Sequence, residues 1–171
     1  MTVTAVQKDP SALTMTLTAE FDATPERVWQ LWADPRQLER WWGPPTYPAT
    51  FPRHELTVGT RTEYYMTGPE GDTPKGYWEI VEVEPPTHIR VHDGFANDDW
   101  SNNDDMPGPG TMDIWIEPIG GGRTRMSIAG DFESPEAMEQ MLAMGMEQGL
   151  IEAVGQIDAI LAEDLITGGT A

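Results

Sequence analysis

Two side chains in the middle of the chain could carry out acid–base chemistry, Glu79 and Tyr64. Glu79 follows Trp78 in a stretch that is apolar on both sides. A carboxyl group buried next to a cavity is harder to ionise, so its pKa rises toward the range where it exchanges protons at neutral pH. The alternative, which we favour, is a salt bridge across the sheet to an arginine such as Arg61 or Arg90.

The spacing of the histidines does not indicate a metal site. His88 and His92 alternate with Ile89 and Val91, which predicts that both histidines face solvent on the outer side of a strand. At roughly 3.3 Å per residue they are about 13 Å apart, too far to bind one ion together. The chain has no cysteine, and it has neither a G-x-S-x-G segment nor a glycine-rich phosphate loop. We expect no metal site and no cofactor.

A polar loop at residues 95–109 carries aspartates at positions 98, 99, 104 and 105. Their spacing does not match an EF-hand calcium loop, and no glutamate stands at the closing position. We therefore expect a solvated, flexible loop. Trp100 and Met106 are unusual in such a loop, and they either cover the mouth of a pocket or pack against the sheet.

Sequence periodicity predicts the elements that must position these residues. Residues 13–21 alternate between apolar and polar side chains, as in a half-buried strand. Thr24-Pro25 begins a short helix that ends at Asp34-Pro35, and a second short helix covers 36–40. Six strand-like runs follow without an intervening helix, which predicts an antiparallel sheet: 47–56, 60–67, 77–83, 88–92, 112–118 and 124–129. We expect one domain at 13–165, a flexible arm at 1–12 and a flexible tail at 166–171.

A long helix is predicted from Ser134 to about Glu163. Ser134 can cap the first free amide groups, and Pro135 suits the first helical position. Gly145 and Gly149, spaced four apart, leave the middle of one side of this helix without bulky side chains. Two interpretations follow: the glycines face an internal cavity, which we favour, or they let the helix pack tightly on the sheet.

Alternation along the strands indicates which side chains face this helix, because residues of one parity share one face of a strand. Methionines adapt to irregular apolar partners, which suits a pocket. The predicted cavity residues are Thr62, Tyr64, Met66, Trp78, Ile114, Met126, Met138, Met141, Leu142, Gly145 and Gly149. Trp41 and Trp42 complete the set, although we favour the interpretation that this pair closes one end of the core, with one ring reaching the cavity.

The segment FDATPERVWQLWADPRQLERWWGPP, at residues 21–45, resembles the opening of the SRPBCC (START-like, helix-grip) superfamily. It is most similar to the branch named after the activator of the 90-kDa heat-shock protein ATPase, and the resemblance covers about 13–163. Leu150 departs from that branch, where an aromatic residue commonly follows the glycine. The resemblance implies an α+β helix-grip fold: a curved antiparallel sheet of six or seven strands around a long C-terminal helix, with two short helices after the first strand. Many members of the superfamily bind a hydrophobic ligand between sheet and helix.

The amino-acid composition makes some classes of binding partner improbable. With 29 acidic and ten basic residues the formal charge is −19, which disfavours binding to nucleic acid. No apolar stretch approaches the ~20 residues of a membrane span, and the first residues lack the features of a signal peptide, so we expect a cytoplasmic protein. If Trp78 and Trp115 lie on the outer face of the sheet, they would form a homodimer surface.

Three functions are consistent with these patterns. The first, which we favour, is binding of a small hydrophobic or aromatic molecule in a cavity between the sheet and the C-terminal helix. The second is a co-chaperone-like protein-interaction module, with a chaperone as partner. The third is a cyclase, hydrolase or lyase that uses a pocket carboxylate such as Glu79 together with Tyr64.

Overall fold

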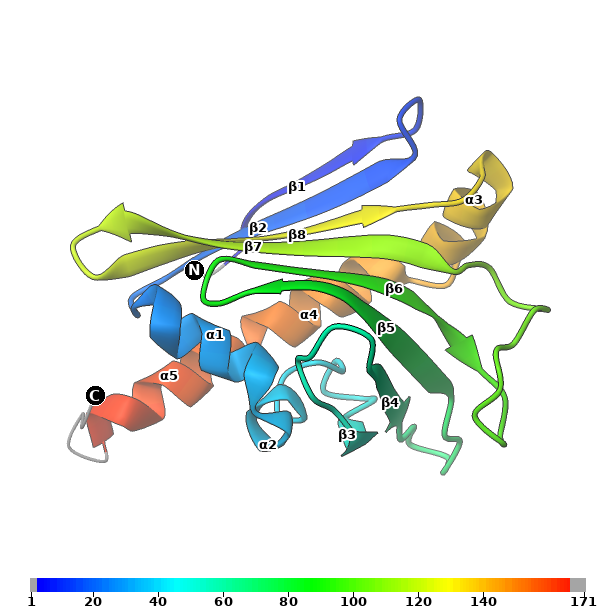
Figure 1. The fold of residues 1–171 in the computed structure, drawn as a ribbon, viewed down its shortest axis with the longest axis horizontal. Helices are drawn as coiled ribbons and strands as arrows, with labels where there is room; N and C mark the ends of the chain where they lie inside the picture. Colours follow the sequence, from blue (N-terminus) through cyan, green and yellow to red (C-terminus); the bar gives the residue numbers. More distant parts are fainter. Residues whose placement is uncertain (1–2, 167–171) are drawn as a thin grey trace.

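A computed structural model describes residues 3–166 of the chain. Eight antiparallel strands form one curved sheet in the order β1-β2-β8-β7-β6-β5-β4-β3 (Figure 1). The strands are β1 (Val3–Asp9), β2 (Thr14–Phe21), β3 (Ala49–Arg53), β4 (Arg61–Met66), β5 (Lys75–Glu84), β6 (His88–Ala96), β7 (Gly110–Gly120) and β8 (Arg123–Asp131). The predicted α+β helix-grip class is confirmed, with eight strands instead of six or seven.

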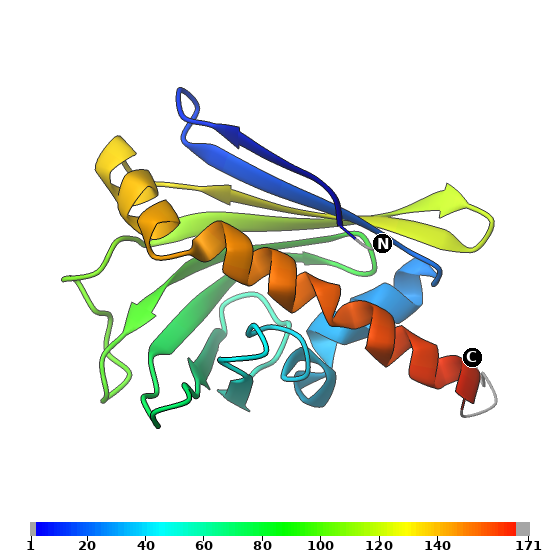
Figure 2. The same ribbon diagram turned by 180° about the vertical axis from the view of Figure 1, so that it is seen from behind.

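Helices cover one face of this sheet: α1 (Pro25–Ala33), α2 (Pro35–Leu38), α3 (Pro135–Ala143), α4 (Met146–Gly155) and α5 (Ile157–Ile166). The predicted helix starts are confirmed, since the Thr24 side chain accepts a hydrogen bond from the Arg27 amide and Ser134 accepts one from Ala137. Figure 2 shows α4 and α5 crossing the sheet, with α1 and α2 beside the α5 end. Within residues 3–166 no helix is both long and apolar enough to cross a membrane.

The first described residues form a strand, so the prediction of a flexible arm is wrong for residues 3–9. β1 pairs with β2 from Asp9↔Thr14 to Val3↔Ala19. Lys8 adds an ion pair to Glu147 of α4, with 2.5 Å between Nζ and Oε1. The sequence of this edge strand alternates only weakly, and it acquires its structure by pairing with β2. The predicted tail lies outside the described residues, except for the last residue of α5.

The predicted unbroken C-terminal helix is wrong, because the chain interrupts it at Gly145. This residue has a φ of +85°, in the left-handed region that disfavours side chains. Figure 2 shows that α3 leaves the direction of α4 at this point. α4 and α5 are separated only at Gln156, whose side-chain amide donates to the carbonyl oxygens of Gly43 at 2.7 Å and Trp41 at 3.3 Å. The predicted C-terminal helix therefore consists of a short separate helix, α3, and a longer one formed by α4 and α5, which Gln156 anchors.

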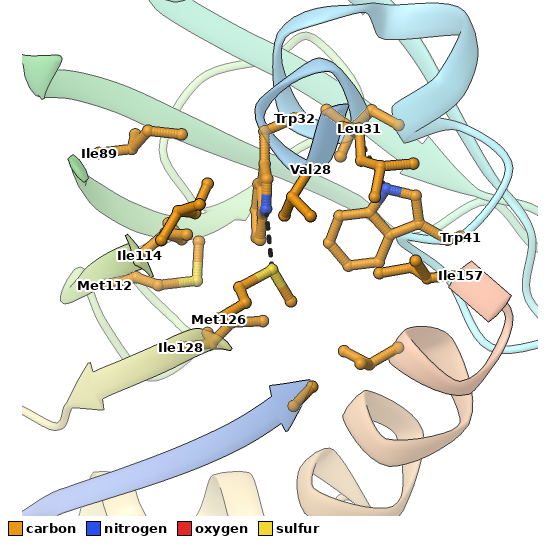
Figure 3. Packing of buried hydrophobic residues seen from close by; sticks show 14 of the residues in the cluster. Val28, Leu31, Trp32, Trp41, Ile89, Met112, Ile114, Met126, Ile128 and Ile157 are labelled. Atoms are coloured by element: carbon orange, nitrogen blue, oxygen red, sulfur yellow. Dashed lines mark hydrogen bonds between the residues drawn. The ribbon is translucent and has the colours of Figure 1, made fainter. Parts of the chain in front are cut away.

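The interior beside α1 and α5 is densely packed around Trp32 (Figure 3). The indole Nε1 of Trp32 donates to the Met126 sulfur at 3.2 Å, and its ring meets Trp41 edge-on with centroids 4.7 Å apart. Trp41 is fully buried and donates from Nε1 to the Leu31 carbonyl at 3.0 Å. Trp42 meets Trp41 edge-on at 5.6 Å. The two tryptophans are therefore part of the packed aromatic core, as the favoured interpretation expects.

The two helix glycines should respond to alanine in opposite directions. Gly145→Ala should lower the free energy of unfolding by about 1–2 kcal/mol, because alanine resists a left-handed φ. Gly149→Ala should raise it by about 0.5–1 kcal/mol, because the residue lies inside α4 with no atom within 4 Å of an added Cβ. Urea denaturation followed by tryptophan fluorescence measures both. Changes of the same sign would contradict the assigned break at Gly145.

Candidate functional site

A pocket of about 340 Å³ opens between the sheet and the α3–α4 junction. It lies at the end of the molecule opposite α1 and α2, where α3 and the long β6–β7 connection are on the same side in both views (Figures 1 and 2). Strands supply Met15, Asp93, Gly94, Phe95, Gly110, Thr111, Met112, Ile128, Gly130 and Asp131 to its wall. The pocket is large enough for a small organic molecule, since ligand sites typically measure roughly 300–1,000 Å³.

The structure brings together six of the predicted cavity residues in this wall: Trp42, Tyr64, Met66, Met141, Gly145 and Gly149. The other seven lie outside it: Trp41, Thr62, Trp78, Ile114, Met126, Met138 and Leu142. Of these, Trp41, Ile114 and Met126 lie in the half that Trp32 and its neighbours fill (Figure 3). Alternation indicates the face of a strand and not the position along it where packing stops.

The helix glycines face open space rather than the sheet. A Cβ built on Gly145 or on Gly149 would meet no atom within 4 Å. Tight packing would place sheet atoms within van der Waals contact of that position, so the tight-packing interpretation is wrong for both residues. The absence of side chains on this part of α4 contributes directly to the volume of the pocket.

Asp93 on β6 places a carboxyl group in the pocket wall. Burial raises the pKa of Asp93 to about 7, because the apolar surroundings disfavour the ionised form, while a hydrogen bond to its own backbone amide opposes the shift. Sequence reasoning missed this residue, since the predicted strand ends at 92. Alternation along the strand could have identified it, because Asp93 is on the same face of β6 as the buried Ile89 and Val91.

Tyr64 adds a hydroxyl group to the same wall. Its ring lies over Gly76 of β5, where an added Cβ would be 2.5 Å from Oη. Burial, followed by the negative charge of Asp93, raises the pKa of Tyr64 above its ordinary value. The indole groups of Trp42 and Trp78, whose Nε1 atoms make no hydrogen bond of ordinary geometry within the described residues, offset part of this shift. The hydroxyl therefore stays protonated and can donate.

Glu79, the carboxylate considered for acid–base chemistry, lies outside the pocket. It is exposed on the outer face, and its Oε1 lies 3.7 Å from Nη1 of Arg61. The favoured salt bridge is confirmed, and Asp93 takes the place of Glu79 as the pocket carboxylate. Trp78 points inward and is 1% exposed, so of the two tryptophans considered for a homodimer surface only Trp115 is on the outer face.

The charges of the pocket wall are negative. Asp93, Asp131 and Glu133 contribute carboxyl groups, and the lining residues of the described chain include no lysine, arginine or histidine. Such a wall repels anionic groups and favours neutral or cationic ones. The pocket is therefore apolar in most of its wall and acidic in its polar part.

The β6–β7 connection, expected to be a solvated and flexible loop, forms hydrogen bonds within itself and to the sheet. Ala96 forms a bridge with Asn102, and the carbonyl of Trp100 accepts a hydrogen bond from Arg61 Nη2 at 2.8 Å. Trp100 and Met106 do not line the pocket, so they do not cover its mouth. Phe95, Pro107 and Gly108 border the pocket instead.

The histidines lie apart from the pocket. His54 is held inside the fold, with Nε2 2.6 Å from the Trp32 carbonyl oxygen, and burial lowers the pKa of its imidazole. His92 is exposed, as predicted. The prediction is wrong for His88, which is 2% exposed because the ring of Trp115 stacks on it at 3.8 Å.

Asp93→Asn should remove a pH-dependent loss of stability. The native pKa is raised above the unfolded value of 3.8, so ionisation of Asp93 destabilises the fold as the pH rises between about 4 and 7. The variant should equal the wild type near pH 4 and exceed its free energy of unfolding by up to about 4 kcal/mol above pH 7. Urea denaturation at a series of pH values measures this.

Asp98→Asn is the control for that series, because it removes a carboxylate that is fully exposed in the β6–β7 connection. It should change the free energy of unfolding by less than about 0.5 kcal/mol at every pH. Parallel pH profiles for wild type and Asp93→Asn would show that Asp93 is not the group that titrates.

Comparisons with known proteins agree on the fold. A sequence model of the family described as "Activator of Hsp90 ATPase homolog 1-like protein" matches residues 22–162. The solution structure of a protein from Arthrobacter aurescens is 51% identical, with a TM-score of 0.90 over 95% of this chain and 93% of its own. A crystal structure from Mycobacterium smegmatis is 46% identical, with a TM-score of 0.85 over 93% and 96%. One from Rhodobacter sphaeroides is 28% identical, with a TM-score of 0.79 over 93% and 99%. A search of curated proteins finds no match.

Proposed function

The chain belongs to the Activator of Hsp90 ATPase homolog 1-like family, and from that premise we propose that it binds a small hydrophobic or aromatic molecule in the pocket under the α3–α4 junction. The observation that supports this most directly is that Gly149 lines the pocket, is half-buried and has open space in front of it. Close packing is the ordinary state of a protein interior. A cavity bordered by glycine, in a sheet whose other half is densely filled, is suited to an occupant.

The polar groups of the wall define the kind of molecule. Tyr64 can donate a hydrogen bond, and Asp93 can donate when protonated or accept when ionised. A ligand with an aromatic or aliphatic body and one polar group would satisfy both residues. A carboxylate or sulfonate on the ligand would lie among the carboxyl groups of Asp93, Asp131 and Glu133. The proposed ligand is therefore neutral or cationic.

A pair of fluorescent probes tests both parts of this proposal. N-phenyl-1-naphthylamine is neutral, and 1-anilinonaphthalene-8-sulfonate has the same aromatic body with a negative charge. The neutral probe should bind with increased fluorescence, and the sulfonate should bind at least about tenfold more weakly, because it enters an acidic wall. Equal affinity for the two probes would contradict the charge argument.

Gly149→Leu should abolish binding of the neutral probe, because the new side chain projects into the cavity. Gly155→Leu is the matched control: its Cβ also meets no atom within 4 Å, but the residue is exposed at the end of α4 and does not line the pocket. Fluorescence titration of both variants measures the effect. Unchanged binding to a folded Gly149→Leu variant would place the ligand elsewhere.

The pKa of Asp93 supports a second candidate, an enzyme that transfers a proton within the pocket. A group that titrates near neutral pH is suited to act as a general acid or base, and Asp93 is such a group. Tyr64 would hydrogen-bond to the reacting oxygen. This is the cyclase, hydrolase or lyase hypothesis, with Asp93 in place of Glu79.

Native mass spectrometry of wild-type and Asp93→Asn protein, purified from the same cell extract, separates the two candidates. A binding protein should carry the same bound mass in both forms. An enzyme should carry, in the Asn variant only, a substrate that the wild type converts and releases.

A further inference from the structure

A second cluster of chemically active side chains lies on the outer face of the sheet, away from the pocket. His88 of β6 is at its centre and is 2% exposed. The indole of Trp115 on β7 covers one face of the imidazole, with centroids 3.8 Å apart and planes 13° from parallel. β6 lies between β7, which carries Trp115, and β5, which carries Glu82 and Glu84. Glu84 pairs directly with His88 across the β5–β6 ladder.

The two glutamates reach this face because of a β-bulge in β5. Ile80 pairs with Val91, whereas Glu82 pairs with Arg90, so Val81 is an extra residue in the strand. A bulge of this kind reverses the faces of the residues that follow it. Val83 consequently packs against the core, and Glu82 and Glu84 point outward beside His88. Without the bulge the valines would occupy this side.

The imidazole of His88 has one satisfied nitrogen and one unsatisfied nitrogen. Nε2 lies 2.7 Å from Oδ1 of Asp113, a contact that favours the tautomer with the proton on Nε2. Nδ1 is buried and has no hydrogen-bond partner within residues 3–166. Two carboxylate oxygens lie close to this nitrogen, Glu84 Oε1 at 3.4 Å and Glu82 Oε2 at 3.5 Å. A carboxylate that orients a histidine through its other nitrogen is the usual support of a metal-binding imidazole.

We propose that His88, Glu82 and Glu84 bind a divalent transition-metal ion of the zinc type. The three ligand atoms lie within 4.8 Å of one another. Ligands held at about 2.0–2.2 Å from a tetrahedral ion are roughly 3.3 Å apart, close to the distances from Nδ1 to the two carboxylates. One imidazole and two carboxylates are a donor set that Zn²⁺ accepts. Water would complete the coordination, because both glutamates are at the surface.

The neighbouring charges are compatible with this assignment. Arg90 contacts the cluster at other atoms than the proposed ligands: its Nε lies 2.8 Å from Asp113, and its Nη1 lies 3.6 Å from Oε1 of Glu82. The Oε2 atom of Glu82 is the one next to His88. The formal charge of −19 adds a general attraction for cations.

Tag-free protein and a zinc salt test the proposal by isothermal titration calorimetry. Wild type should bind about one equivalent of Zn²⁺, and Glu82→Gln/Glu84→Gln should weaken binding at least about tenfold. Both side chains are exposed, at 46% and 67%, so the double variant should fold. Glu117→Gln, which neutralises another exposed glutamate of the sheet, and His92→Ala are controls that should bind as wild type does.

Residue-specific readouts complete the test. Zn²⁺ should move the ¹⁵N resonance of His88 Nδ1 and leave those of His54 and His92 unchanged. Cu²⁺ at the same site should quench the fluorescence of Trp115, and a Trp115→Phe variant, which keeps a ring over His88, should lose that quenching. Equal Zn²⁺ affinity in the double glutamine variant and Glu117→Gln, or an unchanged His88 Nδ1 resonance at saturating zinc, would overturn the proposal.

Discussion

The structure depends on how far the aromatic packing extends along the concave face of the sheet. Trp32, Trp41, Trp42 and Trp78 contact one another at centroid distances of 4.7–6.1 Å, and they fill the half of the interior beside α1 and α5. Three of these pairs, Trp32–Trp41, Trp41–Trp42 and Trp42–Trp78, meet edge-on, a geometry that aromatic rings prefer. Trp42 is the last ring of the cluster, and the pocket begins at its outer side. One rigid cluster thus builds the core and forms a wall of the site.

Local signals predicted the elements well, because they act over a few residues. The Thr24-Pro25 and Ser134-Pro135 caps and the alternation of the strands depend only on neighbours in the chain. β1 was missed because its residues gain their order from β2, about ten positions away. Gly145 was interpreted as a small residue within a helix, whereas its importance is its left-handed backbone. Neither effect can be derived from the type of a single residue.

The residues of the two candidate sites could be predicted only in part, because alternation along a strand indicates which face of the sheet a side chain is on and not what surrounds it there. Parity placed Tyr64 and Met66 on the correct side, and the same rule applied one residue further would have included Asp93. Parity alone cannot place Glu82 and Glu84, because the bulge at Val81 changes parity within β5. The rule also misjudged Ile114 and Met126, which face inward but are covered by α1. β6 consequently carries chemistry on both faces, with His88 directed outward and Asp93 inward.

At Gly149 the stability of the fold and the shape of the pocket can change independently, whereas at most core positions they change together. A substitution in a filled core changes stability and shape together, because every added atom displaces another. At Gly149 an added Cβ would displace no protein atom, so a small side chain can change the volume offered to a ligand while the scaffold is preserved. Selection acting on this codon alone could therefore alter which molecules fit, and two chains with the same fold and tryptophan cluster could diverge in specificity without an intermediate that fails to fold.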